Sequence, residues 1–305
     1  MPVDTSLLSL RSGSPVRRRI RLFIALSLAT ASTAFAQMAR GPDWIVAFSL
    51  PTQDEATFLK GEFSIRDLLI DHINRLQAGH RAAVATFTFS GDSDETGAAG
   101  PILCAISNAL DRGAAVHFVA DSMVKRAKEY QPGLSLNRLA KRRPNPMTLS
   151  VAPRSALMHH KAATFDYGDD NQWTLVASGN FTGAANMRQW NVAVLLRNPD
   201  LFRAFDAEME EFRARRFGGK KHFLHDRTPF RLQDSWDTCW IRFGPYPRTA
   251  NEAVNAETDI RRLFHGAQEE IYFAMHHFNR PSLRRALVAA ANRGVKVCGV
   301  MPESD

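Results

Sequence analysis

Residues 158–166 read Met158-His159-His160-Lys161-Ala162-Ala163-Thr164-Phe165-Asp166, which contains the pattern H-x-K-x4-D. Side chains alternate between the two faces of an extended strand, so His159 and Lys161 would share one face. His160 would point to the opposite face, and we expect it to be structural. About 0.016 chance matches to this pattern are expected in a chain of this composition, so chance is a poor explanation.

A short polar loop comes after this stretch. Ser178-Gly179-Asn180-Phe181-Thr182 follows a strand expected at residues 173–177. Such a loop can bring an amide and a hydroxyl to the pocket that His159 and Lys161 face. A neutral imidazole can attack phosphorus, while Lys161 and Asn180 neutralise the non-bridging oxygens. The combination is typical of chemistry at a phosphate group.

The sequence before this stretch alternates between helical and extended patterns. Apolar spacing predicts an amphipathic helix over residues 64–76 and a second helix over 102–110. Short apolar runs predict strands at 82–89 and 114–120. A strand, a helix and a strand of these lengths predict a right-handed crossover in a mainly parallel sheet.

The same order of elements recurs near the C-terminus. Helices are expected at residues 258–266 and 283–292, and strands at 271–278 and 295–301. Arg112-Gly113-x-x-Val116 matches Arg293-Gly294-x-x-Val297 after Ala-rich helices, at an offset of 181 residues. This pattern indicates an internal repeat. The alternative is the ordinary alternation of strand and helix in any α/β protein.

A helix and a basic connector separate the two copies. Phe205, Met209 and Phe212 lie at helical spacing within residues 203–215, and a basic, glycine-containing segment follows at 216–221. We expect a domain boundary within 218–250. The organisation is then a leader at 1–36, a first domain at 37–245 and the start of a second domain at 246–305.

The N-terminal segment has the pattern of a secretory signal peptide. Arg17, Arg18 and Arg19 precede an apolar, small-residue run over residues 22–36, which ends in Ala34-Phe35-Ala36. The run is shorter than the roughly 20 apolar residues of a membrane-spanning helix. We expect a secreted or periplasmic protein. An uncleaved membrane anchor and an organellar transit peptide are the alternatives.

Composition and charge exclude several classes of protein. The chain has 305 residues, 45% of them hydrophobic and 23% charged, which excludes collagen, coiled-coil rods and disordered tails. Its net charge is +8, but five arginines and one aspartate lie within residues 1–36, so charge alone is a weak argument for nucleic acid. Cys104, Cys239 and Cys298 form no C-x-x-C pair, so neither a disulfide framework nor a zinc site is expected.

From about Ser64 to Asp305 the chain resembles the phospholipase D superfamily, which is named for its HKD motif. The likeness is carried by the H-x-K-x4-D run, by the two Arg-Gly units, and by Ser178-Gly179-Asn180 in place of the family's Gly-Ser-x-Asn. The apolar segment at 191–196 and the Pro199-Asp200 helix start also resemble the family's segments C-terminal to the motif. Ala177 stands where the family usually has glycine.

The resemblance implies an α/β fold with a phospholipase D-like repeat, whose mainly parallel or mixed sheet is flanked by helices, and the start of a second repeat. It implies a two-step exchange through a phosphohistidine. His159 would be the nucleophile or the general acid, and Lys161, Ser178 and Asn180 would bind the phosphate. Asp166 would support the charge network as a third catalytic residue. No metal or other cofactor belongs to this scheme, and no carboxylate cluster with metal-ligand spacing accompanies the motif.

A second H-x-K-x4-D does not occur in the sequence. At the observed repeat offset the second histidine would fall near residue 340. We therefore expect a two-motif enzyme truncated before its second motif. The alternative is a homodimer in which each copy contributes His159.

Three functions are compatible with these features. The first is a hydrolase that releases head groups from phospholipids, with transient contact to a membrane surface. The second is a metal-independent endonuclease, favoured by the basic clusters at residues 141–143, 213–216 and 220–221. The third is a non-catalytic binding protein that kept half of the site.

Overall fold

The computed structural model describes residues 38–49, 65–90, 98–187, 189–222, 228–231, 238–244 and 255–301. The predicted signal peptide at 1–36 lies outside the described residues.

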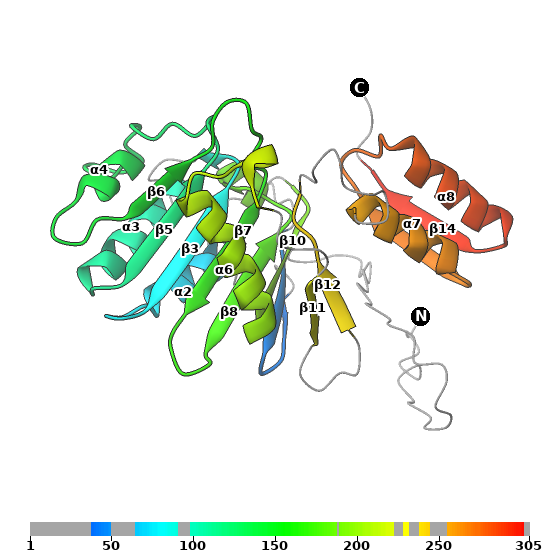
Figure 1. The fold of residues 1–305 in the computed structure, drawn as a ribbon, viewed down its shortest axis with the longest axis horizontal. Coiled ribbons are helices and arrows are strands. Elements are labelled where there is room, and N and C mark those ends of the chain that lie inside the picture. The colour runs from blue at the N-terminus through cyan, green and yellow to red at the C-terminus, as the bar shows by residue number, and fades with distance from the viewer. Residues whose placement is uncertain are drawn as a thin grey trace, which may run out of the picture. The chain divides into compact units, whose positions relative to one another are not determined.

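An eight-stranded mixed sheet forms the centre of the first part of the chain (Figure 1). Its strands, in spatial order, are β1 (Met38–Arg40), β2 (Trp44–Ser49), β10 (Asn191–Arg197), β8 (Gln172–Ala177), β7 (Lys161–Asp166), β3 (Arg81–Thr86), β5 (Ala115–Ala120) and β6 (Thr148–Val151). β3, β5 and β6 run parallel, and every other neighbouring pair is antiparallel. The expected crossover from β3 to β5 is confirmed, and the sheet is mixed rather than mainly parallel.

The strand expected at residues 82–89 is divided in the structure. β3 ends at Thr86, and β4 (Phe89–Ser90) then pairs with β9 (Phe181–Thr182) in a separate ladder. The side chain of Thr86 donates to the carbonyl oxygen of Thr88, at 2.7 Å, across this break. The break brings the loop after β3 beside the loop after β8.

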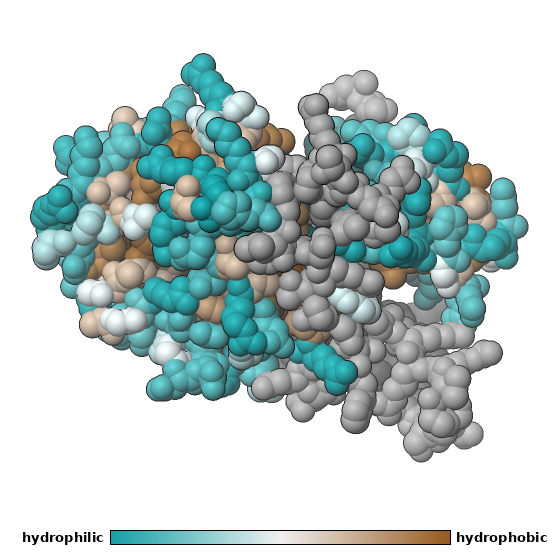
Figure 2. Space-filling view, in the orientation of Figure 1, coloured by the Kyte–Doolittle hydropathy of each residue, from teal (hydrophilic) through white to brown (hydrophobic). Residues whose placement is uncertain are grey.

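Helices cover both faces of the large sheet. α2 (Ile65–Asn74) and α3 (Ala99–Asp111) lie on the far side in Figure 1, and α6 (Pro199–Arg213) lies on the near side. β3 shows the two layers directly, because Val84 packs in the core beneath α2 and α3 while Ala83 and Ala85 pack in the core beneath α6. This alternation follows from the two-residue period of a strand. Figure 2 shows hydrophilic residues over most of the face that carries α6.

α6 begins earlier than the apolar spacing alone predicts. Asn198 caps it by accepting a 2.9 Å hydrogen bond from the amide of Leu201, and Pro199 occupies the first turn. The predicted apolar face of the helix is confirmed, since Phe205, Met209 and Phe212 are all buried in the core against the sheet. The helix therefore closes one face of the strands that carry the H-x-K residues.

The remaining short elements connect these layers. They are α4 (Leu136–Lys141), α5 (Gly183–Met187), the 3-10 turn η1 (Gly218–Lys220), β11 (Thr228–Arg231) and β12 (Thr238–Ile241). None of the helices among the described residues is long and apolar enough to span a membrane.

The C-terminal elements have the predicted order. α7 (Ala256–Gly266), β13 (Glu270–Ala274), α8 (Pro281–Asn292) and β14 (Lys296–Val300) follow one another, and the two strands pair in parallel. This is the order and strand direction of α2, β3, α3 and β5.

The matched Arg-Gly pairs perform the same task in both copies. Arg112 donates to the last carbonyls of α2, and Arg293 donates to the last carbonyls of α7. The acceptors are the carbonyl oxygens of Leu76, Asn74 and Ile73 for the first arginine (2.7–3.2 Å), and those of Phe264, His265 and Ala267 for the second (3.0–3.3 Å). Gly113 and Gly294 end the preceding helices at φ of 88° and 87°, a region that glycine adopts without strain. The repeat is therefore one of structure as well as of sequence.

Candidate active site

The H-x-K residues lie at one end of the central strands of the large sheet, which we call the motif edge. His159 comes just before β7, and Lys161 is its first residue. Lys161 pairs across the sheet with Thr86 at the end of β3, and Thr86 pairs with Ala120 at the end of β5. β8 is antiparallel to β7, so its last residues reach the same edge. The start of β7 and the ends of β3, β5 and β8 therefore lie together near His159 and Lys161.

Lys161 is a buried cation against the histidine. Only 8% of the residue is exposed. Its Nζ lies 3.2 Å from Nδ1 of His159, donates to the His159 carbonyl oxygen at 2.8 Å, and sits 5.4 Å from the centre of the Phe87 ring. Burial lowers the pKa of Lys161 to about 8. The ammonium therefore remains mostly charged at neutral pH, with little water around it.

His159 is exposed, and its ring lies against that of Phe87 in a tilted arrangement, with ring centroids 4.5 Å apart. Its pKa is lowered, first by partial burial and then by the positive charges of Lys161 and His160, while Asp121 acts in the opposite direction. A lowered pKa keeps the imidazole neutral at neutral pH, which is the form that can attack an electrophile.

Asn180 is held by the loop that follows β3. Its Oδ1 accepts a 3.3 Å hydrogen bond from the amide of Thr88. β4 and β9 pair immediately beyond these two residues and fix the two loops together. With its oxygen engaged in this way, Asn180 can offer its amide nitrogen to a phosphate oxygen.

Ser178 is at the same edge, but its hydroxyl has other partners. It donates to Oδ1 of Asn191 at 3.1 Å and accepts from the amide of Val192 at 3.0 Å. A Cβ on Gly179 would lie 2.6 Å from Cγ of Asn191, so this close packing requires the glycine. The structure thus uses Ser178 to join β8 to β10 and does not bring it to Lys161. Ala177 pairs with Ala193 within the β8–β10 ladder, where its methyl group fits.

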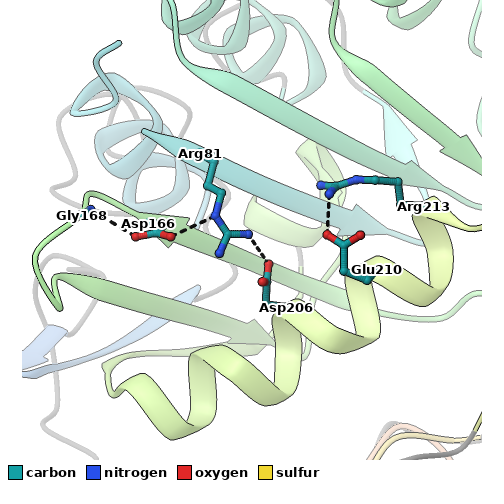
Figure 3. Close-up of polar contacts among 6 residues, drawn as sticks. All are labelled: Arg81, Asp166, Gly168, Asp206, Glu210 and Arg213. Atoms are coloured by element: carbon teal, nitrogen blue, oxygen red, sulfur yellow. Dashed lines mark hydrogen bonds and ion pairs between the residues drawn. The ribbon is translucent and has the colours of Figure 1, made fainter. Parts of the chain in front are cut away.

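Asp166 lies at the opposite end of β7, about 16 Å along the strand from Lys161. Figure 3 shows its carboxylate accepting from Nε of Arg81 at 2.9 Å and from the amide of Gly168 at 3.1 Å. Arg81 also donates to Asp206 of α6, at 2.7 Å. The expectation that Asp166 joins the catalytic charges is corrected by this placement. The strand separates the aspartate from the histidine, and its partners tie β3, β7 and α6 together.

His160 points to the opposite face from His159, as the strand alternation predicts. Its Nε2 lies 3.2 Å from Oε1 of Glu208 on α6. The rings of Phe212 and Phe243 pack beside it, at 5.1 and 6.0 Å between centroids. These contacts belong to the interior of the fold.

Two residues of the site are missing from the sequence-based prediction, Phe87 and Asp121. Asp121 is 2% exposed, and it accepts hydrogen bonds from the amides of Met123 and Met158, each at 3.0 Å. Both residues follow the last residue of a parallel strand, and the carboxyl ends of such strands commonly carry functional groups. Their position directly after parallel strands could have identified Phe87 and Asp121 from the sequence.

Among the residues that the structure describes, no group of three or more His, Cys, Asp or Glu side chains is arranged to hold a metal ion.

Comparisons with known proteins place this site in a family. Residues 69–213 match the family model described as "Cardiolipin synthase, PLD-like domain". None of the curated proteins compared with the chain matches it.

The similar solved structures include Nuc from Salmonella typhimurium, a phospholipase D family member (21% identity, 48% of this chain and 85% of that chain, TM-score 0.35). They also include NucT from Helicobacter pylori (14% identity, 56% and 96%, TM-score 0.38) and polyphosphate kinase from Porphyromonas gingivalis (12% identity, 79% and 36%, TM-score 0.48). The matched segment contains the whole H-x-K-x4-D run and the loop of Asn180, so residues 69–213 form a phospholipase D-like domain.

Proposed function

We propose that the chain is a phospholipase D-type hydrolase that releases head groups from phospholipids through a phosphohistidine on His159. In the first step the imidazole attacks phosphorus, and the bond from phosphorus to the leaving alcohol breaks. A second histidine gives that alcohol its proton. In the second step the same histidine takes a proton from water, and the resulting attack breaks the phosphorus–nitrogen bond.

One observation carries the hydrolase proposal. The neutral imidazole of His159 lies 3.2 Å from a buried, charged Lys161 at an open edge of the sheet. The ammonium can stabilise the negative charge that grows on the phosphoryl oxygens, and in a poorly hydrated site that stabilisation is strong. Asn180 adds a donor from the neighbouring loop.

The second histidine has two proposed sources. In the first copy, Lys161 begins its strand 46 residues after β5 begins at Ala115. The same spacing from β14 places an equivalent strand near residue 340, in a longer chain. The other source is a second copy of this chain that contributes its own His159.

Exposed hydrophobic residues around the site support a lipid substrate. Met123 follows β5, Leu157 precedes His159, and Trp190 precedes β10, so all three lie at the edge of the sheet that carries the motif. Their exposed fractions are 66%, 69% and 66%. Lone exposed hydrophobics are common on protein surfaces, but three at one functional edge indicate an interaction site.

Exposed basic residues accompany this hydrophobic edge. Lys125 and Arg126 follow β5, and Arg154 follows β6. Tryptophan, leucine and methionine beside lysine and arginine suit the boundary of an anionic membrane, where apolar side chains enter the head-group layer.

A nuclease of the same superfamily is the second candidate, because several basic clusters occur in the sequence. Several cations of those clusters are already paired with carboxylates. Arg142 pairs with Asp111, Arg213 with Glu210, Arg216 with Glu211, and Lys221 with Glu208. Paired cations release fewer counterions on binding a phosphate backbone. This observation favours lipid over nucleic acid.

The substrate proposal is tested with the complete enzyme on phospholipid vesicles that contain anionic lipid. We expect head-group release from the vesicles while plasmid DNA stays intact at the same enzyme concentration. Changing Met123→Ser together with Trp190→Ser should weaken vesicle hydrolysis roughly tenfold or more, since each lost apolar insertion costs on the order of 1–2 kcal/mol. Hydrolysis of a soluble diester, bis(p-nitrophenyl) phosphate, should be unchanged.

The matched control is Trp44→Ser. Trp44 is also exposed, but it pairs with Leu196 at the opposite edge of the sheet. Equal losses for this control, or plasmid cleavage that weakens steeply with salt, would overturn the lipid proposal.

A further inference from the structure

Two buried carboxylates hold the residues on either side of His159, one from the end of β5 and the other from α6. We propose that Asp121 and Glu208 are positioning residues that fix the His159 imidazole for attack on phosphorus. This inference rests on the proposed function, since it concerns the nucleophile named there.

Asp121 holds the residue before the histidine. It lies one position past β5, and only 2% of it is exposed. One carboxylate oxygen, Oδ1, accepts from the Met123 amide and the Ser122 hydroxyl, at 3.0 and 3.2 Å, and so caps its own turn. The other oxygen, Oδ2, accepts from the amide of Met158 at 3.0 Å. Because β3 lies between β5 and β7, this bond joins strand ends that are not neighbours in the sheet.

Glu208 holds the residue after the histidine. It is 1% exposed in the middle of α6, and its Oε1 lies 3.2 Å from Nε2 of His160. The same oxygen accepts from the buried ammonium of Lys221, which also donates to the carbonyl oxygen of Gly244 at 2.8 Å. Burying a carboxylate is costly unless it is paired and hydrogen-bonded, and here both conditions are met. The pKa of Glu208 is lowered: the bond from His160 and the charge of Lys221 outweigh its burial.

The arrangement of His159 explains why such anchors matter. Its ring is exposed and lies against the Phe87 ring and the ammonium of Lys161. The position of an exposed ring also depends on the backbone on either side of it, which Met158 and His160 provide. A displacement of about 1 Å at the reacting atom can cost on the order of a hundredfold in rate.

Glu211 provides a matched comparison on the same helix. It is 5% exposed and accepts from Arg216 at 2.8 and 2.9 Å, and from the amide of His222 at 3.0 Å. It resembles Glu208 in charge, burial and ion pairing, but none of these partners belongs to the H-x-K-x4-D run. Loss of its charge should reduce stability without moving His159.

The test compares Glu208→Gln, Asp121→Asn and Glu211→Gln in the complete protein. Hydrolysis of bis(p-nitrophenyl) phosphate is followed well below each unfolding midpoint. We expect Glu208→Gln and Asp121→Asn to lower kcat roughly ten- to a hundredfold with little change in KM. Glu211→Gln should lower the unfolding midpoint and leave kcat unchanged.

A second pair of variants keeps the test decisive if Glu208→Gln does not fold. A glutamine at position 160 can donate to Glu208 much as Nε2 of His160 does. His160→Gln should therefore retain most of kcat, and His160→Ala should lose it. Equal kcat for these two variants, or equal losses for the Glu208 and Glu211 variants, would overturn the positioning role.

His159→Ala separates this proposal from the proposed function. An active His159→Ala variant would overturn the function itself. An inactive His159→Ala variant beside fully active Asp121→Asn and Glu208→Gln variants would overturn only the positioning role.

Discussion

At the scale of single residues, the site combines a neutral imidazole with a buried ammonium. Lys161 is buried beside His159, and the burial that lowers its pKa to about 8 also keeps water from screening its charge. The same location therefore makes the cation both more effective and easier to deprotonate. His159 gains its neutral form from partial burial and from the adjacent positive charges.

These two shifts predict a pH profile for kcat/KM. His159 must be neutral, and its lowered pKa places the acid-side loss of activity below the ordinary histidine value of about 6.5. Lys161 must be protonated, so activity should fall as the pH rises through about 8. Lys161→Arg, which stays charged, should move the alkaline loss upward even where it lowers the rate. An alkaline limb at the same pH in this variant would assign that limb to another group.

Asp166 gives a prediction that opposes the expectation from the motif. Its carboxylate pairs with Arg81 and the Gly168 amide at the far end of β7. Asp166→Asn should cost about 1 kcal/mol of unfolding free energy, as partly exposed ion pairs do, with kcat unchanged. Chemical unfolding and steady-state kinetics on the same samples check this. A collapse of kcat in folded protein would return Asp166 to the catalytic group.

At the scale of elements, two arginines each join one helix to the end of another: Arg112 follows α3 and binds the end of α2, and Arg293 follows α8 and binds the end of α7. Arg112 and Arg293 each donate to three carbonyls at a helix end, where the helix dipole favours a cation. Arg112→Ala should cost roughly 1–3 kcal/mol of unfolding free energy. Arg112→Lys should not restore it, because an ammonium lacks the planar fork of donors. The control is Arg75→Ala, whose exposed pair with Asp71 should contribute about 0.5 kcal/mol. Equal losses at positions 75 and 112 would contradict the capping role.

Elements with strong local signals could be predicted from the sequence. Apolar spacing and the Arg-Gly stops located α3, α6, α7 and α8, each within a few residues of its observed bounds. Strand direction could not be predicted in the same way, because an apolar strand reads alike in parallel and antiparallel sheets. β7 runs antiparallel to β3. A turn through Gly168, Asp169 and Asp170, all at positive φ, then leads into β8, which is antiparallel to β7.

The site was predictable to a similar extent. His159 and Lys161 lie together as strand alternation predicts, and the loop of Asn180 is hydrogen-bonded to the loop that follows β3. Asp166 and Ser178 do not join them, because their positions depend on long-range partners, Arg81 and Asn191, which the motif does not contain.

At the scale of the whole molecule, the signal-peptide pattern predicts export. Arg17 to Arg19, the apolar run and Ala34-Phe35-Ala36 precede Gln37. Expression of the full-length gene in its source cell should give mature protein with its N-terminus near Gln37, outside the cytoplasm. N-terminal sequencing of the purified protein checks this. Exported protein that still begins at Met1 would indicate an uncleaved anchor.

The most direct test of the account is chemical trapping of the intermediate on His159. The complete enzyme is mixed with a phosphodiester substrate in the presence of a chelator, quenched with alkali, digested and analysed by mass spectrometry. We predict a phosphoryl adduct on the peptide that contains His159, stable to alkali and labile to acid, and its loss together with turnover in His159→Asn. An adduct confined to another residue, or undiminished turnover in His159→Asn, would contradict the assignment of His159 as the nucleophile.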